Sequence, residues 1–250
     1  MRSTRLTLGI LIATAVVLLA TAIGPIPQPP EYHALADQRI IFGIPRAADV
    51  LSNLVFLFAG LYGLSALDAA RRVRGLRRVR ACYGMFFLSL IATAAGSAWY
   101  HLAPDDARLL WDRLPIAIGC AALLSVTLRQ CLNLPSCISP FLLGFALLSV
   151  AWWGLMNDLR PYLLLQIATM IVIPVAQQSA AASSRERLAF GIAVGCYVLA
   201  KICEFADQRL FDMLPLSGHT LKHLLAGMGA FAIARYFVCR ASLRKSSTSG

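Results

Sequence analysis

The chain has 250 residues, of which 58% are hydrophobic and only 14% are charged. A soluble globular domain carries roughly 25% charged residues, so this composition cannot cover a water-facing surface. A soluble enzyme, a disordered chain and an ordinary nucleic-acid-binding domain are therefore excluded, and the sequence predicts an all-α, polytopic membrane protein. The formal net charge of +11 then has its meaning in the distribution of the basic residues over the loops, because this distribution indicates the orientation of the spans.

Eight apolar runs are candidates to cross a bilayer, for which a helix needs about 20 mostly apolar residues. They cover residues 6–24, 47–67, 82–102, 108–128, 138–156, 161–178, 188–205 and 219–238. We expect a membrane helical bundle of eight spans, in which one N-terminal helix precedes a seven-helix core over residues 37–238. No soluble domain is expected, because the loops between the runs are short.

Residues 1–36 contain the first run and a Pro-rich loop. Basic residues flank this run, and Ala20-Thr21-Ala22 matches the A-x-A pattern of a signal-peptide cleavage site. A cleaved signal peptide is one interpretation, but the apolar stretch is long for a signal peptide and we favour an uncleaved helix. At the other end, residues 239–250 finish in a polar, Ser-rich sequence and are expected to form a disordered cytoplasmic tail.

The fourth run is the shortest, because only fifteen uncharged residues separate its two flanking arginines. Pro104 followed by Asp105 and Asp106 is typical of a helix N-terminus, where acidic side chains lie at the positive end of the helix dipole. We therefore expect this helix to begin near these residues and to carry Asp112 in its first turns.

Basic residues are unequally distributed over the loops. If the N-terminus is inside, the inner segments hold fourteen Lys and Arg residues and the outer loops hold six. This bias predicts that both termini are cytoplasmic. The arginine-rich segment 71–80 could be read as a nucleic-acid patch, but we interpret it as a cytoplasmic anchor that touches anionic membrane lipids. The short loops favour a bacterial inner membrane.

Three of the four histidines are predicted to lie at one membrane depth. His101 falls at the outer end of its span, and Asp112, His219 and His223 fall near the outer ends of theirs. Ionisable residues at membrane depth are costly and indicate a functional site. His219 and His223 have the i, i+4 spacing that lets two imidazoles bind one ion. Ser97 and His101 share this spacing, so both can face the same site.

Three neutral imidazoles and an open coordination position are typical of a catalytic zinc, which lowers the pKa of its bound water to about 7. We therefore predict one zinc ion held by His101, His219 and His223. Asp112 is the candidate general base, and Ser97 is the candidate hydrogen-bond donor to the substrate carbonyl. The alternative is a receptor-like or transport-like protein with a structural zinc, for which Asp112 could be the fourth ligand.

The sequences GSAWYH at 96–101 and GHTLKH at 218–223, with Asp112 between them, resemble the signature of the alkaline ceramidase family. That signature is S-x-x-x-H at the end of one helix, an Asp at the start of the next, and H-x-x-x-H in the last. Residues 49–53, with a polar residue and a Ser-Asn pair, look like the family's first core helix. The resemblance covers roughly residues 37–238, and the family belongs to a superfamily of seven-helix membrane hydrolases that includes the adiponectin receptors.

The resemblance implies that His101, His219 and His223 bind zinc, that Asp112 orients and deprotonates the zinc water, and that Ser97 assists. The implied reaction cleaves the amide bond of a ceramide-like lipid, giving a sphingoid base and a fatty acid. Hydrolysis of another lipid amide or ester is left open. Eukaryotic members carry an acidic, Trp-containing calcium loop before the first core helix. Residues 31–39 here have two acids and no Trp, so we assign no calcium site.

Further polar and aromatic residues lie near the outer ends of the spans. The acids could line an entrance or bind a headgroup, or they could be solvated or make packing contacts between helices: Asp49, Glu204, Asp207 and Asp212. Lys201 stands three residues before Glu204, which predicts a local ion pair. The aromatic residues are predicted to form an interfacial belt: Trp99, Tyr100, Trp111, Trp152 and Trp153.

Overall fold

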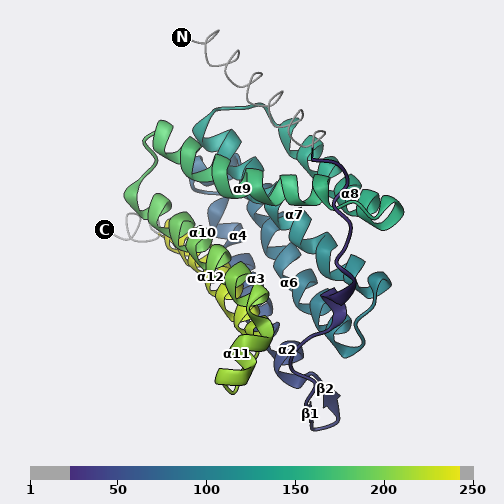
Figure 1. The fold of residues 1–250 in the computed structure, drawn as a ribbon. Coiled ribbons are helices and arrows are strands. Elements are labelled where there is room, and N and C mark those ends of the chain that lie inside the picture. The colour runs from purple at the N-terminus through teal and green to yellow at the C-terminus, as the bar shows by residue number, and fades with distance from the viewer. Residues whose placement is uncertain (1–22, 243–250) are drawn as a thin grey trace.

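The computed structural model describes residues 23–242 as a bundle of helices (Figure 1). Within this part of the chain, seven helical segments are long and apolar enough to cross a membrane, which confirms the predicted seven-helix core. The predicted first span, 6–24, falls almost entirely on residues outside the described part. The helices that form the spans are α2 (Ala47–Ser52) with α3 (Leu54–Leu64), α6 (Arg80–Leu102), α7 (Asp106–Cys131), α8 (Ile138–Met156), α9 (Arg160–Ser179), α10 (Ser184–Phe205) and α12 (Gly218–Ser242).

The start of α7 confirms the prediction made from its acidic residues. The helix begins at Asp106, and the side chain of Asp105 caps it by accepting a hydrogen bond from the backbone N–H of Arg108 at 2.7 Å. The carboxylate satisfies one of the N–H groups that have no partner within the helix. Asp112 therefore lies in the second turn of α7, as the sequence indicated.

Two boundaries differ from the predictions. The second apolar run was expected to continue to residue 67, but α3 ends at Leu64 and two short helices follow, α4 (Leu67–Ala70) and α5 (Arg74–Arg77). The tail was expected to be disordered from residue 239, whereas α12 continues to Ser242. Residues 243–250 lie outside the described part of the chain.

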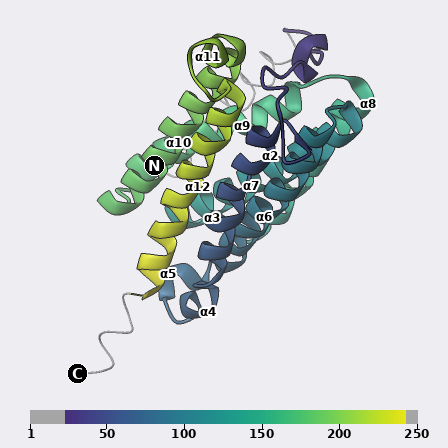
Figure 2. The ribbon, with the colours of Figure 1, turned by 90° about the horizontal axis from the view of Figure 1, so that it is seen from below.

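The core of the bundle is formed by two closely packed helix pairs. Helix α6 packs along α7, and α10 packs along α12, while α3 contacts both α6 and α12 (Figure 1). Figure 2 shows α4 and α5 at one end of the bundle and α11 (Asp207–Met213) at the other. From Arg80 to His101, α6 rises by about 30 Å, which is also the thickness of a bilayer's hydrocarbon core. The arginine-rich segment and the histidines therefore lie at opposite ends.

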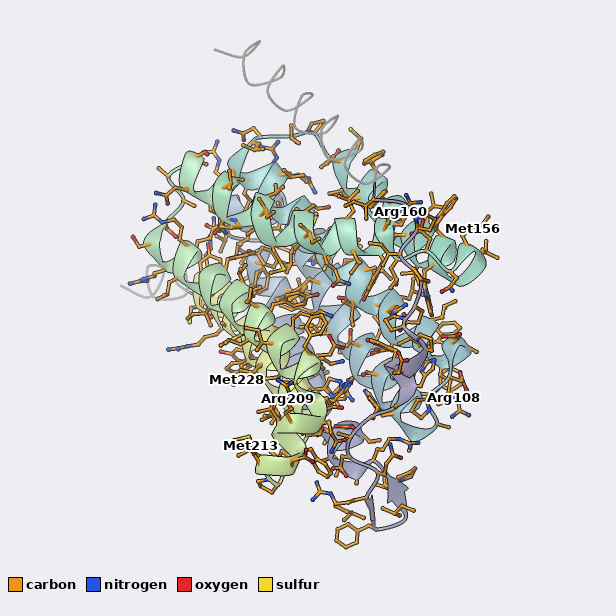
Figure 3. All side chains as sticks on the ribbon, viewed as in Figure 1. Arg108, Met156, Arg160, Arg209, Met213 and Met228 are labelled. Atoms are coloured by element: carbon orange, nitrogen blue, oxygen red, sulfur yellow. The ribbon has the colours of Figure 1, made fainter. Side chains whose placement is uncertain are left out.

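The segment before α2 runs across the histidine end of the bundle. It includes the short helix η1 (Pro30–His33) and a hairpin of β1 (Ile40–Ile41) and β2 (Ile44–Pro45). The backbone N–H of Leu159 donates to the carbonyl of Ile26 at 2.8 Å, which ties the segment to the α8–α9 connection. Figure 3 labels Met156 and Arg160 on either side of this connection. These contacts hold the segment over the ends of the spans.

Candidate metal centre

Three histidines meet where α6 ends and α12 begins. His101 lies in the last turn of α6, and His219 and His223 lie in the first two turns of α12. The ligating nitrogen atoms lie within 4.8 Å of one another, and the ring centroids are 4.7–4.9 Å apart. All three side chains are buried. The predicted convergence of these histidines is therefore present in the fold.

Several nitrogens of this group have no partner in the described part of the chain. Both ring nitrogens of His101 and Nε2 of His219 are buried without a hydrogen bond. Leaving a buried polar atom without a partner costs about 1–3 kcal/mol. Neutral imidazole nitrogens that converge on one point are the donors that zinc prefers. The three side chains thus fit a zinc ion in chemistry and in arrangement.

Ser52 orients His223 from α2. Its Oγ lies 2.8 Å from Nδ1 of His223 and 2.9 Å from the backbone carbonyl of Asp49. The carbonyl can only accept, so the hydroxyl proton goes to the carbonyl and Nδ1 of His223 donates to Oγ. This arrangement leaves Nε2 of His223 free to bind a metal, which is the usual role of a hydrogen-bond partner behind a ligating histidine. The Ser-Asn pair at residues 52 and 53 was singled out in the sequence, but nothing in the sequence indicated the bond to His223.

Two acidic side chains fix the start of α12. Asp207 accepts a hydrogen bond from the backbone N–H of His219 at 2.8 Å. Ser217 accepts one from the backbone N–H of Thr220 at 2.9 Å, which is the contact of an N-cap residue. Asp49 accepts hydrogen bonds from the hydroxyls of Ser217 at 2.9 Å and Thr220 at 2.5 Å. Asp49 and Asp207 therefore position the first turn of α12. Of the roles considered in the sequence analysis, these are the packing contacts between helices.

Asp112 and Ser97 face each other between α7 and α6. The side chains of Ser97 and Asp112 lie close to each other, and both are buried. Gly96 permits this approach, because a Cβ at that position would collide with the backbone carbonyl of Trp111. Ser97 stands one turn before His101 on α6, so the two side chains lie on the same face of that helix. Among the described residues, the histidine group contains only the three histidines and no carboxylate.

A network of charges surrounds the start of α12. Lys201 lies 2.8 Å from Glu204, which confirms the predicted ion pair, and Lys222 lies 3.0 Å from the other oxygen of Glu204. The hydroxyl of Tyr32 donates to Glu204 at 3.2 Å. Burial raises the pKa of Tyr32 well above its ordinary value, so this hydroxyl stays protonated. The contacts of Lys222 and Tyr32 join distant parts of the chain, and local spacing did not indicate them.

Arg113 corrects one expectation from the sequence. It was counted with the basic residues of the outer loops, but its side chain is buried within α7. Its guanidinium lies 4.1 Å from the centre of the Trp153 ring, 5.2 Å from that of Tyr32 and 5.5 Å from that of Tyr162. Gln28 accepts a hydrogen bond from the same group. Cation–π contacts of this kind stabilise a buried guanidinium.

The predicted aromatic belt is only partly supported. Trp99, Trp111 and Trp152 are exposed, as residues at a membrane interface would be. Tyr100 and Trp153 are buried instead, so assigning them to the belt was wrong. The Tyr100 hydroxyl lies 3.0 Å from Nδ1 of His33, the one histidine outside the metal group.

In comparisons with known proteins, no family model and no curated protein matches the chain. The assignment of a function therefore depends on the geometry of the site and on the sequence motifs.

Proposed function

We propose that the protein is an integral-membrane, zinc-dependent amidohydrolase that cleaves ceramide-like lipids to a sphingoid base and a fatty acid. The proposal is supported chiefly by the three buried histidines, whose nitrogens converge on one point and largely lack partners. The neighbouring Asp112 and Ser97 supply the other groups that amide hydrolysis needs. The alkaline-ceramidase resemblance gives the substrate class.

His101, His219 and His223 would hold the zinc, which would supply a bound water with a pKa near 7. The carboxylate of Asp112 would accept the proton released at the water and deliver it to the amide nitrogen as the C–N bond breaks. The Ser97 hydroxyl would donate a hydrogen bond to the substrate carbonyl oxygen as that oxygen gains negative charge. Burial of these side chains excludes bulk water and strengthens each of these interactions.

A structural zinc in a receptor-like or transport-like protein is the second candidate. A closed structural site needs a fourth protein ligand. The separation of Asp112 from the ligand group favours an open coordination position, and hence the hydrolase. Hydrolysis of a different lipid amide or ester would use the same residues and is distinguished by the choice of substrate.

The test measures zinc content and hydrolysis on the same detergent-purified preparation, with ceramides and acyl-amino lipids as substrates. Asp112→Asn should keep stoichiometric zinc and lose about 10²- to 10⁴-fold in kcat, the usual value of a general acid–base group. His219→Ala should lose zinc. Asp68→Asn is the control, because Asp68 is exposed at the other end of the bundle. Loss of zinc in Asp112→Asn, with no hydrolysis by the unmodified protein, would instead support the structural site.

We also propose that both termini are cytoplasmic and that the metal centre faces the outer, periplasmic side of a bacterial inner membrane. The basic-residue bias supports this orientation. Reporter domains fused after Arg80 should be cytoplasmic, and reporter domains fused after Leu102 should be external. The opposite pattern would place the metal centre in the inner leaflet.

A further inference from the structure

A polar cavity lies at the arginine-rich end of the bundle, remote from the histidines. Its volume is about 390 Å³. The α4–α5 segment, the end of α7, the α9–α10 connection and the end of α12 surround it. Its lining contains four arginines and one acid: Arg74, Arg78, Arg129, Arg240 and Glu186.

The acidic side chains of the described residues neutralise only part of the positive charge of this cavity. All twelve acidic residues of the sequence lie between positions 31 and 212, so the structure describes each of them. Glu186 lies 3.8 Å from Arg240 and accepts a hydrogen bond from Tyr236. Within residues 23–242, the other three arginines of the cavity form no ion pair with any of these acids. The described lining of the cavity therefore carries an excess of three positive charges, which favours an anionic ligand.

The arginines are held in place by contacts between the surrounding elements. Arg78 donates to the side chain of Asn133 at 3.1 Å, which fixes it against the α7–α8 connection. The backbone of Gly75 approaches Arg240 so closely that a Cβ there would lie 2.6 Å from the guanidinium. Arg129 donates to the Cys82 sulfur at 3.3 Å, and its Nε is buried without a partner in the described chain. Part of the donor capacity therefore remains available to a ligand.

We propose that this cavity binds the phosphate group of an anionic membrane phospholipid. Guanidinium groups match phosphate oxygens with paired N–H donors, which makes arginine the preferred residue for this recognition. The volume lies within the range of about 300–1,000 Å³ that is typical of small-molecule sites, so it admits a headgroup and leaves the acyl chains outside. The position, about 30 Å along α6 from the histidines, corresponds to the opposite membrane surface. Basic pockets between helices at the cytoplasmic surface bind anionic headgroups by the same chemistry.

The test uses the full chain, delipidated in detergent, with added phosphatidylglycerol, phosphatidylcholine of the same acyl chains, or inorganic phosphate. Lipid retention by native mass spectrometry and the rise in Tm report binding. The double variant Arg74→Gln/Arg78→Gln should bind phosphatidylglycerol at least about tenfold more weakly, because it loses charge-assisted hydrogen bonds. The control Arg71→Gln/Arg77→Gln removes the same charge from the same segment without changing the lining of the cavity, and should keep its affinity.

Equal weakening in the two double variants would show a diffuse surface effect and overturn the proposal. If phosphatidylglycerol and phosphatidylcholine raised the Tm of the unmodified protein equally, the proposal would also be overturned. This measurement needs no variant, so the test remains decisive if a variant does not fold. If inorganic phosphate raised the Tm as much as phosphatidylglycerol does, the cavity would still be a phosphate site, but the proposal that a lipid supplies the phosphate would be overturned. The metal centre is not involved in any of these measurements, so the result is independent of the proposed hydrolase activity.

Discussion

Ser52 contacts His223 through the ring nitrogen that would face away from a bound metal, and replacing Ser52 tests whether this contact supports zinc binding. In Ser52→Ala, Nδ1 of His223 loses the oxygen at 2.8 Å that accepts its proton. The imidazole then becomes free to rotate and to change the nitrogen that carries the proton. Both changes cost free energy when Nε2 must point at the metal.

The expected size of the effect follows from the kind of contact that is lost. Removing the hydrogen-bond partner of a ligating histidine typically lowers metal affinity by about 10- to 100-fold. Because each factor of ten in affinity corresponds to about 1.4 kcal/mol, the expected loss in binding free energy is about 1.4–2.8 kcal/mol. Two of the three ligands are unchanged in this variant, so we expect weaker zinc binding and not its abolition.

The assay is a competition titration in detergent, in which a chelator of known affinity removes zinc from the protein. Ser89→Ala is the matched control, because Ser89 is also a buried helical serine whose hydroxyl donates to the carbonyl three residues earlier, at 2.7 Å. Ser89 has no histidine partner. Unchanged zinc affinity in Ser52→Ala, or an equal loss in Ser89→Ala, would refute the proposed role of this contact.

Two further predictions concern packing and pH. Gly96→Ala should destabilise the protein by about 1–3 kcal/mol and lower kcat, because the added Cβ forces the Trp111 carbonyl and the adjoining Asp112 away from α6. Gly144→Ala is the control, because a Cβ at that position contacts nothing within 4 Å. In denaturant unfolding this control should be as stable as the unmodified protein or more stable. Equal losses of stability in the two variants would contradict the packing argument. The Asp158 carboxylate accepts a hydrogen bond from Arg160, and this contact lowers the pKa of Asp158. The contribution of the ionised carboxylate to stability is therefore present above the unfolded-state pKa of about 3.9 and is lost at lower pH. Asp158→Asn should therefore lower the Tm at pH 7, and the difference from the unmodified protein should shrink below about pH 4; a pH-independent difference would exclude this ion pair as its cause.

The spans could be predicted from the sequence because the bilayer imposes a length and an apolar composition on each of them. The start of α7 could be predicted as well, because its Pro-Asp-Asp sequence satisfies the helix end locally. Arg113 shows the limit of this reasoning. A charged residue near a span end is normally solvated, but here three aromatic side chains from distant segments surround it.

The sequence by itself determined that His219 and His223 share a helix face, since their spacing is one helical turn. It also indicated that His101 lies at the same depth, because span direction and length set the depth of each residue. Only the tertiary structure decided that the three rings meet, that Ser52 fixes His223 across 171 positions, and that no carboxylate in the described chain joins the ligand group. Helical spacing specifies neighbours within a few residues, whereas contacts between spans depend on how the helices rotate and pack. That packing depends on close approaches such as that of Gly96 to the α7 backbone, which periodicity along one helix does not reveal.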